Sequence, residues 1–353
     1  MSLLDQLRAI ADEHGSSQGV AGVEPFAEVA DDISRRVASG AHGGLGFTFN
    51  DAATATNPRA SWRWCEAIVV VAVPYLERGD GRWPGEGSDV RRGGRPGVAR
   101  FADGDRYDRV RAMLADVATH LEGLGSRADA VFDDDRLVDR AVAVRAGVAW
   151  WGKSTMAITP GFGPWFLIGS VVTDAEIDPT PPMERSCGTC DACIPACPTG
   201  AIIAPGFLDA RRCLAAVLQQ RGSVPDDLRT AVGGRIYGCD ECLAACPPGD
   251  RALDAQQAGG SLSPQEVLTM TDEALDDSFA HWFVPGRQPR FLRRNALVAL
   301  GNTGTSSDIH LLAAYASHPD ALLRDHARWA LGELDEADAS SVLATLDAPE
   351  VPP

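Results

Sequence analysis

"CGTCDACIPACPTGAI", residues 187–202, carries four of the nine cysteines in this chain of 353 residues, and a proline follows the fourth. Its spacing is CxxCxxCxxxCP. A second set follows, in which Cys213 stands alone and "CDECLAACP" at 239–247 carries three more cysteines. Eight cysteines in two sets of four match the ligand number of two [4Fe-4S] clusters. The sequence therefore predicts a ferredoxin-like domain over residues 181–260.

The order of the cysteines also predicts which cluster each one binds. In two-cluster bacterial ferredoxins, three closely spaced cysteines bind one cluster, while the fourth, before the proline, binds the other. The first cluster is therefore assigned to Cys187, Cys190, Cys193 and Cys246, and the second to Cys197, Cys213, Cys239 and Cys242.

Zinc and disulfide bonds are the alternative uses of such cysteines. No histidine lies between His120 and His281, and the CxxxCP ending is typical of ferredoxins rather than of zinc ribbons. A disulfide framework is typical of small secreted domains, and the first residues do not resemble a secretory signal. The ninth cysteine, Cys65, precedes an apolar run and is predicted to be a small core residue.

Composition and length describe the rest of the chain. Hydrophobic residues make up 45% and charged residues 23%, values of a soluble globular protein, and the length predicts two or three domains. The longest apolar run, "AIVVVAV" at 67–73, is too short to cross a membrane. We therefore expect a cytoplasmic protein, and a monomer.

The net charge of −17 argues against broad attraction to nucleic acid, so an RNA partner would have to bind a local basic patch. One candidate is "GRQPRFLRRN" at 286–295, which contains Arg287, Arg290, Arg293 and Arg294 and no acid. On charge alone, a solvated helix face explains this stretch equally well.

Hydrophobic patterns predict an α+β chain, in which the types of secondary structure differ before and after the cysteine-rich segment. Residues 1–180 mix helices with buried strands, notably "AIVVVAVPY" and "PWFLIGSVV", and contain no GxGxxG or GxxxxGK[ST] motif. Residues 265–350 are rich in alanine and leucine. There "RRNALVALGNTG" and "RDHARWALGEL" align with a period of 31 residues, which suggests stacked helix pairs of the HEAT type or a plain helical hairpin. A simple electron carrier would need neither flanking domain.

Several motifs, in this order, resemble the epoxyqueuosine reductase family, the cobalamin-dependent iron-sulfur enzymes of tRNA queuosine synthesis. They are "RAGVAWWGKS", "PWFLIGSVVTD", "CDACIPACPTGAI", "DARRCL", "GGRIYGCDECLAACP" and "RFLRRNALVALGN". The resemblance implies a cobalamin-binding catalytic domain over 1–180, similar to that of reductive dehalogenases, and a HEAT-like domain over 265–350 that helps to hold the tRNA anticodon arm. It also implies reduction of epoxyqueuosine to queuosine and water by two electrons and two protons.

The same resemblance implies positions for the cofactor and for a general acid. The corrin would lie near Asn57, Asp133, Ala157, Ile168, Ala215, Asp240 and Glu241. Its cobalt would take no histidine from the protein; "DIHLLA" at 308–313 is the nearest match to a cobalt-ligand motif and lies in the repeat. Asp133 would protonate the departing oxygen, although an acid in "VFDDDRLVDRA" also suits a helix-capping turn.

The chain departs from the family around this site. Asp134, Asp135 and Arg136 stand where small residues and proline are usual. Asn57, Asp108 and Ala215 replace an arginine, a histidine and a small hydroxyl residue, and "CPPG" lacks the usual tryptophan. Two alternatives therefore stay open: a corrinoid iron-sulfur reductase of a small molecule, and an electron-transfer protein without a substrate. The sequence identifies no electron donor.

Overall fold

The computed structural model describes residues 1–76, 97–253, 262–334 and 337–346. Its contacts divide the described residues into two compact units. The first contains 1–76, 105–211 and 241–253, and the second contains 97–104, 212–240 and the residues from 262 onward. The cysteine-bearing segment thus contributes to both units. None of the helices in the described ranges is long and apolar enough to span a bilayer.

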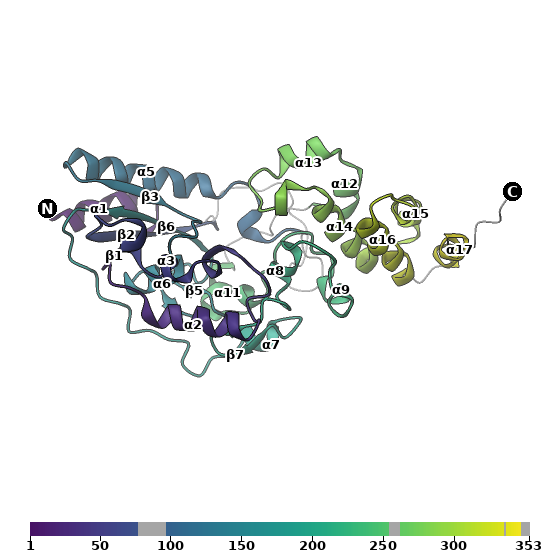
Figure 1. The fold of residues 1–353 in the computed structure, drawn as a ribbon, viewed down its shortest axis with the longest axis horizontal. Helices are drawn as coiled ribbons and strands as arrows, with labels where there is room; N and C mark the ends of the chain where they lie inside the picture. Colours follow the sequence, from purple (N-terminus) through teal and green to yellow (C-terminus); the bar gives the residue numbers. More distant parts are fainter. Residues whose placement is uncertain (77–96, 254–261, 335–336, 347–353) are drawn as a thin grey trace. The chain divides into compact units, whose positions relative to one another are not determined.

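An antiparallel four-stranded sheet forms the centre of the first unit (Figure 1). Its order is β1 (Ser17–Ala21), β2 (Ala67–Pro74), β6 (Phe166–Thr173) and β3 (Ala128–Val131). All eight residues of β2 are buried, because the strand is central and both faces of the sheet are covered. This explains why the strand reads as an unbroken apolar run rather than as an alternating pattern.

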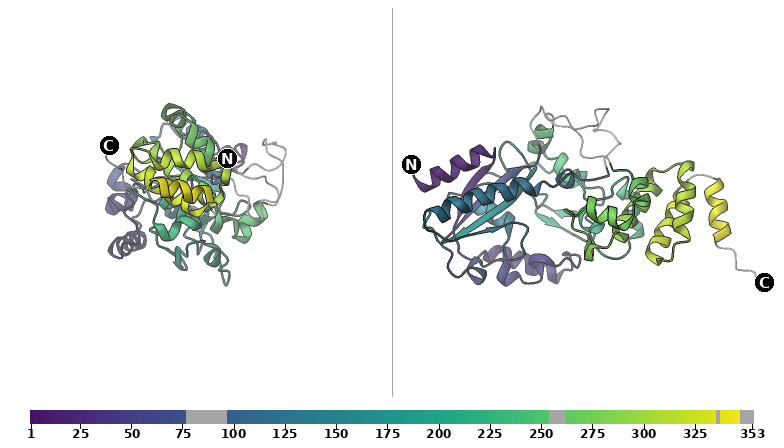
Figure 2. Two further views of the ribbon diagram at one scale, coloured as in Figure 1. Left: turned by 90° about the vertical axis from the view of Figure 1, so that its right-hand side faces the viewer. Right: turned by 90° about the horizontal axis from the view of Figure 1, so that it is seen from above.

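Helices cover the two faces of the sheet (Figure 2). Val69, Val71 and Val73 point to the core under α1 (Leu3–Glu13) and α5 (Tyr107–Gly123). The alternate residues of β2 point to the other core, which contains side chains from α2 (Ala27–Ala38) and α6 (Asp139–Arg145). The two buried strands predicted from the apolar runs at 67–75 and 164–172 are confirmed as β2 and β6.

The second unit is helical. It contains α8 (Leu214–Leu218), α9 (Asp226–Val232), α12 (Pro264–Thr269), α13 (Asp272–Ser278), α14 (Arg290–Thr303), α15 (Ile309–Ala316), α16 (Ala321–Glu333) and α17 (Ala337–Leu346). The two copies of the 31-residue repeat fall on α14 and α16, which pack together. Gly301 permits this packing, because a Cβ there would lie 2.8 Å from the Cα of Ala330.

Two buried polar residues of α14 hold the segments that carry Cys213 and Cys239. The Arg294 guanidinium donates to the carbonyls of Gln220 (2.8 Å) and Leu218 (3.2 Å). The Asn295 amide donates to the carbonyls of Leu218 and Ile236, both at 2.8 Å. Since Leu218 ends α8 and Ile236 precedes Cys239, this pair ties both cysteine-bearing segments to the helical repeat.

We expect Arg294→Met to destabilise the protein by about 3 kcal/mol, because it leaves several buried carbonyls without a donor. Arg294 has no exposed surface, and burial lowers the pKa of its guanidinium to about 10. The measurement is the midpoint of urea unfolding, followed by far-UV circular dichroism under anaerobic conditions. Arg287→Met is the matched control because Arg287 is exposed. Equal midpoints for the two variants would contradict a structural role for Arg294.

Candidate iron-sulfur and substrate site

Of the four cysteines predicted to bind the first cluster, two lie in a loop, one begins a short helix and one lies between two short helices. Cys187 and Cys190 lie in that loop, and Cys193 begins α7 (Cys193–Ala196). α7 packs against α10 (Glu241–Ala244), which directly precedes Cys246. Residues about 50 positions apart in the sequence are thereby brought together within the first unit.

The position of Cys246 is fixed by close packing between the turn at 162–165 and α11 (Pro247–Leu253). The buried Trp165 donates from Nε1 to the carbonyl of Gly249 at 2.9 Å. Gly163 has a φ of +62°, and a Cβ there would lie 2.6 Å from the Gly249 nitrogen. Only glycine suits both the backbone conformation and this contact. The sequence pattern gave no sign of this support for Cys246.

The four thiols of this set lie close enough to interact electrostatically. Burial raises the pKa of Cys246, and Cys187, Cys193 and Cys190 add to the rise. Burial likewise raises the pKa of Cys193, again helped by Cys187 and Cys190. Within the described ranges, no three His, Cys, Asp or Glu side chains lie close enough for a single metal ion. A [4Fe-4S] cluster requires cysteine sulfurs that lie farther apart than the ligands of a single ion, because each cysteine binds a different iron.

The four cysteines assigned to the second cluster are distributed over both units, and this assignment stays a prediction. Cys197 and Cys242 belong to the first unit, and Cys213 and Cys239 to the second. The sulfur of Cys197 accepts a hydrogen bond from the Ala201 amide at 3.2 Å. Burial alone would raise the pKa of Cys197, but hydrogen bonds from Thr199, Ala201 and Ile202 lower it overall. Such amide donors are what a thiolate bound to iron requires.

Asp133 lies in the loop between β3 and α6 and has an unusual backbone. Its φ is +49°, a left-handed conformation that aspartate tolerates better than most residues. The neighbouring Asp134 is paired with Arg136, at 2.6 Å between Oδ2 and Nη2, and Arg136 lies over the ring of Trp62. In the part of the chain that the structure describes, no hydrogen bond or ion pair engages the Asp133 carboxyl.

The electrostatic surroundings of Asp133 favour its protonated form. Although the residue keeps exposed surface, burial by the surrounding loop raises the pKa of its carboxyl, and the negative Asp134 adds to the rise. By contrast, the hydrogen bonds from Arg136 lower the pKa of the neighbouring Asp134. A raised pKa and a strained backbone in one loop are features typical of functional acids.

Asp139, at the start of α6, is a second acid that the sequence reading missed. Its Oδ1 is buried and has no hydrogen-bond partner among the described residues. Burial and then the charge of Asp133 raise its pKa to about 8, against the effect of Arg140. Asp139 therefore holds a proton at neutral pH. An acid within six residues of Asp133, at the start of an apolar helix, was the available signal.

Asp139 makes the stability of the protein depend on pH. The unfolded chain releases this proton near pH 4, whereas the folded protein keeps it until about pH 8, so stability falls as the pH rises through this window. We expect Asp139→Asn to remove this loss and to stabilise the protein at pH 7.5 by roughly 1–3 kcal/mol. Thermal unfolding measured from pH 5 to 8 tests this. Parallel curves for the two proteins would contradict it.

The remaining predicted cofactor contacts occupy different environments. In the first unit, Asn57 precedes α4 (Pro58–Ser61), and Ala157 lies in β5 (Ala157–Ile158). Ala157 belongs to one apolar cluster with Leu137, which follows the Asp133 loop, and Ile168 of β6 packs against this cluster. Ala157 and Ile168 therefore adjoin one apolar layer on the α6 side of the sheet.

The other three predicted contacts flank the later cysteines. Ala215 is half-buried on α8, and Glu241 begins α10. Asp240 is buried, and its carboxylate accepts from the Arg100 amide at 2.9 Å and from Arg100 Nη1 at 3.2 Å. The Asp240 side chain is thus occupied inside the protein.

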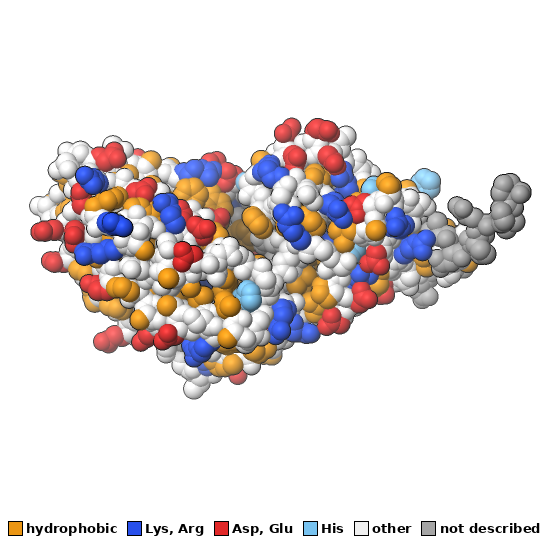
Figure 3. Space-filling model, in the orientation of Figure 1, with side chains coloured by type: hydrophobic (Ala, Val, Ile, Leu, Met, Phe, Trp, Pro, Cys, Tyr) orange, Lys and Arg blue, Asp and Glu red, His pale blue; other side chains and the backbone are white. Residues whose placement is uncertain are grey.

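The predicted basic patch on α14 is wrong in one member and weakened in two others. Arg294 is fully buried and cannot contact a partner. Arg290 is paired with Asp320 at 2.9 Å, and Arg293 with Asp272. Figure 3 shows acidic and basic side chains intermixed over these helices. The sequence window contained no acid, but the fold brings acids from neighbouring helices.

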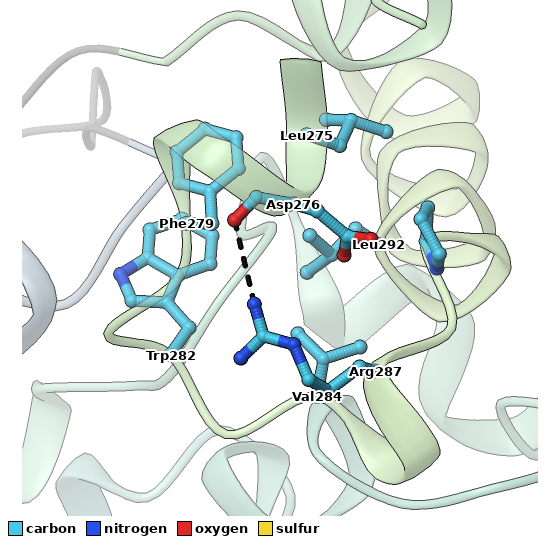
Figure 4. Close-up of a pocket in the computed structure, with 8 residues that line it drawn as sticks. Leu275, Asp276, Phe279, Trp282, Val284, Arg287 and Leu292 are labelled. Carbon is cyan, nitrogen blue, oxygen red and sulfur yellow. Dashed lines mark hydrogen bonds between the residues drawn. The ribbon is translucent and has the colours of Figure 1, made fainter. Parts of the chain in front are cut away.

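Arg287 is the exposed member of the patch, and it borders a small cavity (Figure 4). Its guanidinium donates to the carbonyls of Ala280 (3.3 Å) and Asp276 (3.5 Å). The lining also includes Leu275, Phe279, Trp282, Val284, Pro289 and Leu292. The cavity, about 10 Å³, has room for about one water molecule, so it is too small for a ligand.

Known proteins resemble this chain over nearly its whole length. The 4Fe-4S double cluster binding domain family matches residues 186–249. A protein of Bacillus anthracis named epoxyqueuosine reductase is 30% identical over 90% of this chain and 84% of its own length. Another of that name, from Xanthomonas campestris pv. campestris, is 32% identical over 93% of this chain and 95% of its own length.

Solved structures share the fold. An epoxyqueuosine reductase in complex with an epoxyqueuosine-modified stem loop of tyrosine tRNA matches with a TM-score of 0.84 and 27% identity, over 99% of this chain and 95% of that one. A Bacillus subtilis epoxyqueuosine reductase, described as having its catalytic aspartate loop swung out of the active site, matches with the same TM-score, 26% identity and the same coverage.

Proposed function

Because this chain belongs to the epoxyqueuosine reductase family and is an oxidoreductase, we propose that it reduces epoxyqueuosine to queuosine at the wobble position of tRNA. The observation that carries the proposal is the Asp133 loop. It presents a carboxyl with a raised pKa next to the apolar layer formed around Ala157 and Leu137. The catalytic aspartate loop named for the Bacillus subtilis structure supports the same role here.

The clusters would supply electrons one at a time. The family match over 186–249 supports two [4Fe-4S] clusters, and the interacting thiols of Cys187, Cys190, Cys193 and Cys246 support the predicted first set. Cys197, Cys213, Cys239 and Cys242 would hold the second cluster. We retain the predicted division into a catalytic domain over 1–180, a cluster domain over 181–260 and a HEAT-like domain over 265–350.

Cobalamin is the cofactor that the proposed reaction requires besides the clusters. Its fit is supported by the apolar layer of the first unit, where the small side chain of Ala157 and the half-buried Ile168 would accommodate a flat macrocycle. The half-buried Asn57 is proposed as a further contact. When bound, cobalamin would supply a reducible cobalt centre close to the epoxide. Ala215, Asp240 and Glu241 are proposed contacts too, Asp240 through its main chain.

The chain's own residues would manage the protons. Reduction of the epoxide consumes two electrons and two protons and releases water. Asp133 would donate a proton to the oxygen as its bond to carbon breaks, which requires a carboxylic acid that is still protonated at neutral pH. Burial of the loop and the neighbouring Asp134 favour that state. Asp139, which holds its proton to about pH 8, adds no negative charge beside Asp133 below that pH.

The proposed partner is the anticodon arm of tRNA, supported by the stem loop bound to the similar solved structure. The modified base would have to turn out of the anticodon loop to reach Asp133. Because Arg294 is buried, the proposed contact patch is reduced to Arg290 and Arg293 on α14 and Arg287 just before it. Since most of these are paired with acids, we expect recognition by shape more than by charge.

Turnover under anaerobic conditions tests the proposal. The protein, loaded with cobalamin and reduced by dithionite with a viologen mediator, is given tRNA that contains epoxyqueuosine. Mass spectrometry of the digested tRNA should then detect queuosine. The free epoxyqueuosine nucleoside is the second substrate, because a small-molecule reductase would convert it equally well. Failure with tRNA, by protein that carries both clusters and cobalamin, would overturn the proposal.

A further inference from the structure

Lys153 is the single lysine of this chain. The sequence contains 32 lysines and arginines, and 31 of them are arginine. A chain that otherwise uses arginine for every basic side chain has a compact ammonium at this one position. Lysine and arginine differ in shape, since the ammonium is a point charge and the guanidinium is a planar fork with five donors.

The structure places this ammonium on the loop of the first cluster set. Lys153 Nζ donates to the carbonyl of Gly188 at 2.9 Å, between Cys187 and Cys190. The carbonyl of Lys153 accepts from the amide of Gly206 at 2.9 Å, in the turn between β7 (Ile202–Ala204) and β8 (Phe207–Leu208). One residue thus connects the cysteine loop to the hairpin that follows it.

The backbone around Lys153 is held in place. It lies between β4 (Trp150–Trp151) and β5, which pair as a two-stranded sheet. Gly152 is closely packed, since a Cβ there would lie 2.9 Å from the Met156 carbonyl oxygen, and Thr155 has a φ of +70°. A turn constrained in this way fixes the starting point of the side chain, so the position of the ammonium is determined by the fold.

The charge of Lys153 acts on the cluster ligands. Because the ammonium is bonded to Gly188, its positive charge lies on the loop that carries Cys187 and Cys190. A [4Fe-4S] cluster gains one electron on reduction and becomes more negative by one charge, and its potential depends on the net charge and hydrogen bonds around it. A nearby half-buried cation therefore stabilises the reduced cluster more than the oxidised one.

We infer that Lys153 is a positioning residue for the cluster of Cys187, Cys190, Cys193 and Cys246. Its ammonium holds the Cys187–Cys190 loop through Gly188, and its charge raises the reduction potential of this cluster relative to the other. An arginine would bring the same charge on a larger planar group, which cannot occupy the single-acceptor position on Gly188 in the same way. The inference concerns electron delivery and does not depend on which substrate is reduced.

A redox titration of Lys153→Met tests the inference. In the anaerobic holoprotein, electron paramagnetic resonance follows both clusters as dithionite lowers the potential. At a fixed potential, we expect the ratio of reduced to oxidised first cluster to fall about tenfold, a shift of about 59 mV for one electron. The second cluster is the internal reference and should not shift. Unchanged potentials, or equal shifts of both clusters, would overturn the inference.

Two variants separate the local effect from a general one. Lys153→Arg keeps the charge and should recover most of the potential shift, although its cluster loop should give a broadened spectrum. Arg35→Met removes one charge from an exposed position on α2, where the side chain is 72% exposed, and should change neither potential. If Arg35→Met produced the same shift as Lys153→Met, total charge rather than Lys153 would be responsible.

Chemical modification covers the case in which Lys153→Met does not assemble its clusters. Because the chain has one lysine, acetylation of the assembled holoprotein removes the ammonium charge at this position, and reductive methylation keeps it. Both reagents also modify the terminal amine, so Lys153→Arg, which has no lysine, is treated in the same two ways to measure the effect of the terminal charge alone. We expect only acetylation to lower the potential of the first cluster. Identical potentials after both treatments would overturn the inference, and neither result involves tRNA turnover.

Discussion

Asp133→Asn is expected to slow epoxyqueuosine reduction by at least about a hundredfold while both clusters remain bound. The amide has nearly the same shape as the carboxyl but carries no acidic proton. Substrate and cofactor should still bind, because the apolar layer beside the loop is unchanged. The measurement is single-turnover conversion of tRNA, together with iron content and the visible spectrum of the clusters.

Asp135→Asn is the matched control for this prediction. Asp135 belongs to the same run of three aspartates and is exposed, as Asp133 is, but it lacks the left-handed backbone of Asp133. The control variant should keep normal turnover, since Asp133 differs from it in its surroundings rather than in its type. Raising the pH should lower the activity of the unmodified protein as Asp133 loses its proton. The residual activity of Asp133→Asn should not show this decrease with pH. Normal activity in Asp133→Asn would rule out the acid role.

Cys246→Ala is expected to remove the first cluster, although Cys246 lies about 50 residues from the other three ligands in the sequence. Iron and sulfide should fall to about half, because four of eight irons are lost. Turnover should fall below detection, since electrons would lack part of their path. Cys197→Ala should instead remove the second cluster, and the two variants should differ in their paramagnetic spectra.

Cys65→Ala provides the control for general damage by loss of a cysteine. Cys65 is fully buried in the sheet core, and burial raises the pKa of its thiol, as expected for an inert core residue. This variant should keep all of its iron and its activity. A Cys246→Ala protein with the full iron content would show that the predicted exchange of the fourth ligand is wrong.

Local signals in the sequence predicted much of this structure. The unbroken apolar run of β2 reflects burial on both faces of the strand. The amphipathic pattern of α1 reflects burial on one face of the helix. The spacing of Cys187, Cys190, Cys193 and Cys246 predicted a group that the structure brings together. In each case the pattern depends on residues close in sequence or on a fixed ligand geometry.

The features that the sequence did not reveal depend on contacts between distant residues. Arg294 looked like part of a surface patch, because its buried acceptors lie more than 70 residues away. The ion partners of Arg290 and Arg293 come from other helices. Asp139 resembled an ordinary helix-starting acid until the fold enclosed its Oδ1. The burial of these polar side chains therefore could not be predicted from local sequence patterns.

The bonds made by Arg294 and Asn295 have a consequence for how the chain can be divided. A polypeptide ending near residue 260 would retain all eight cluster cysteines, and would look like a complete ferredoxin cassette. It would lack the donors that hold the carbonyls of Leu218, which follows Cys213, and Ile236, which precedes Cys239. The helical repeat thus holds in place two of the segments that carry cluster cysteines. We expect such a fragment to be a poor electron carrier. A functional iron-sulfur domain therefore needs the helical residues beyond the last cysteine motif.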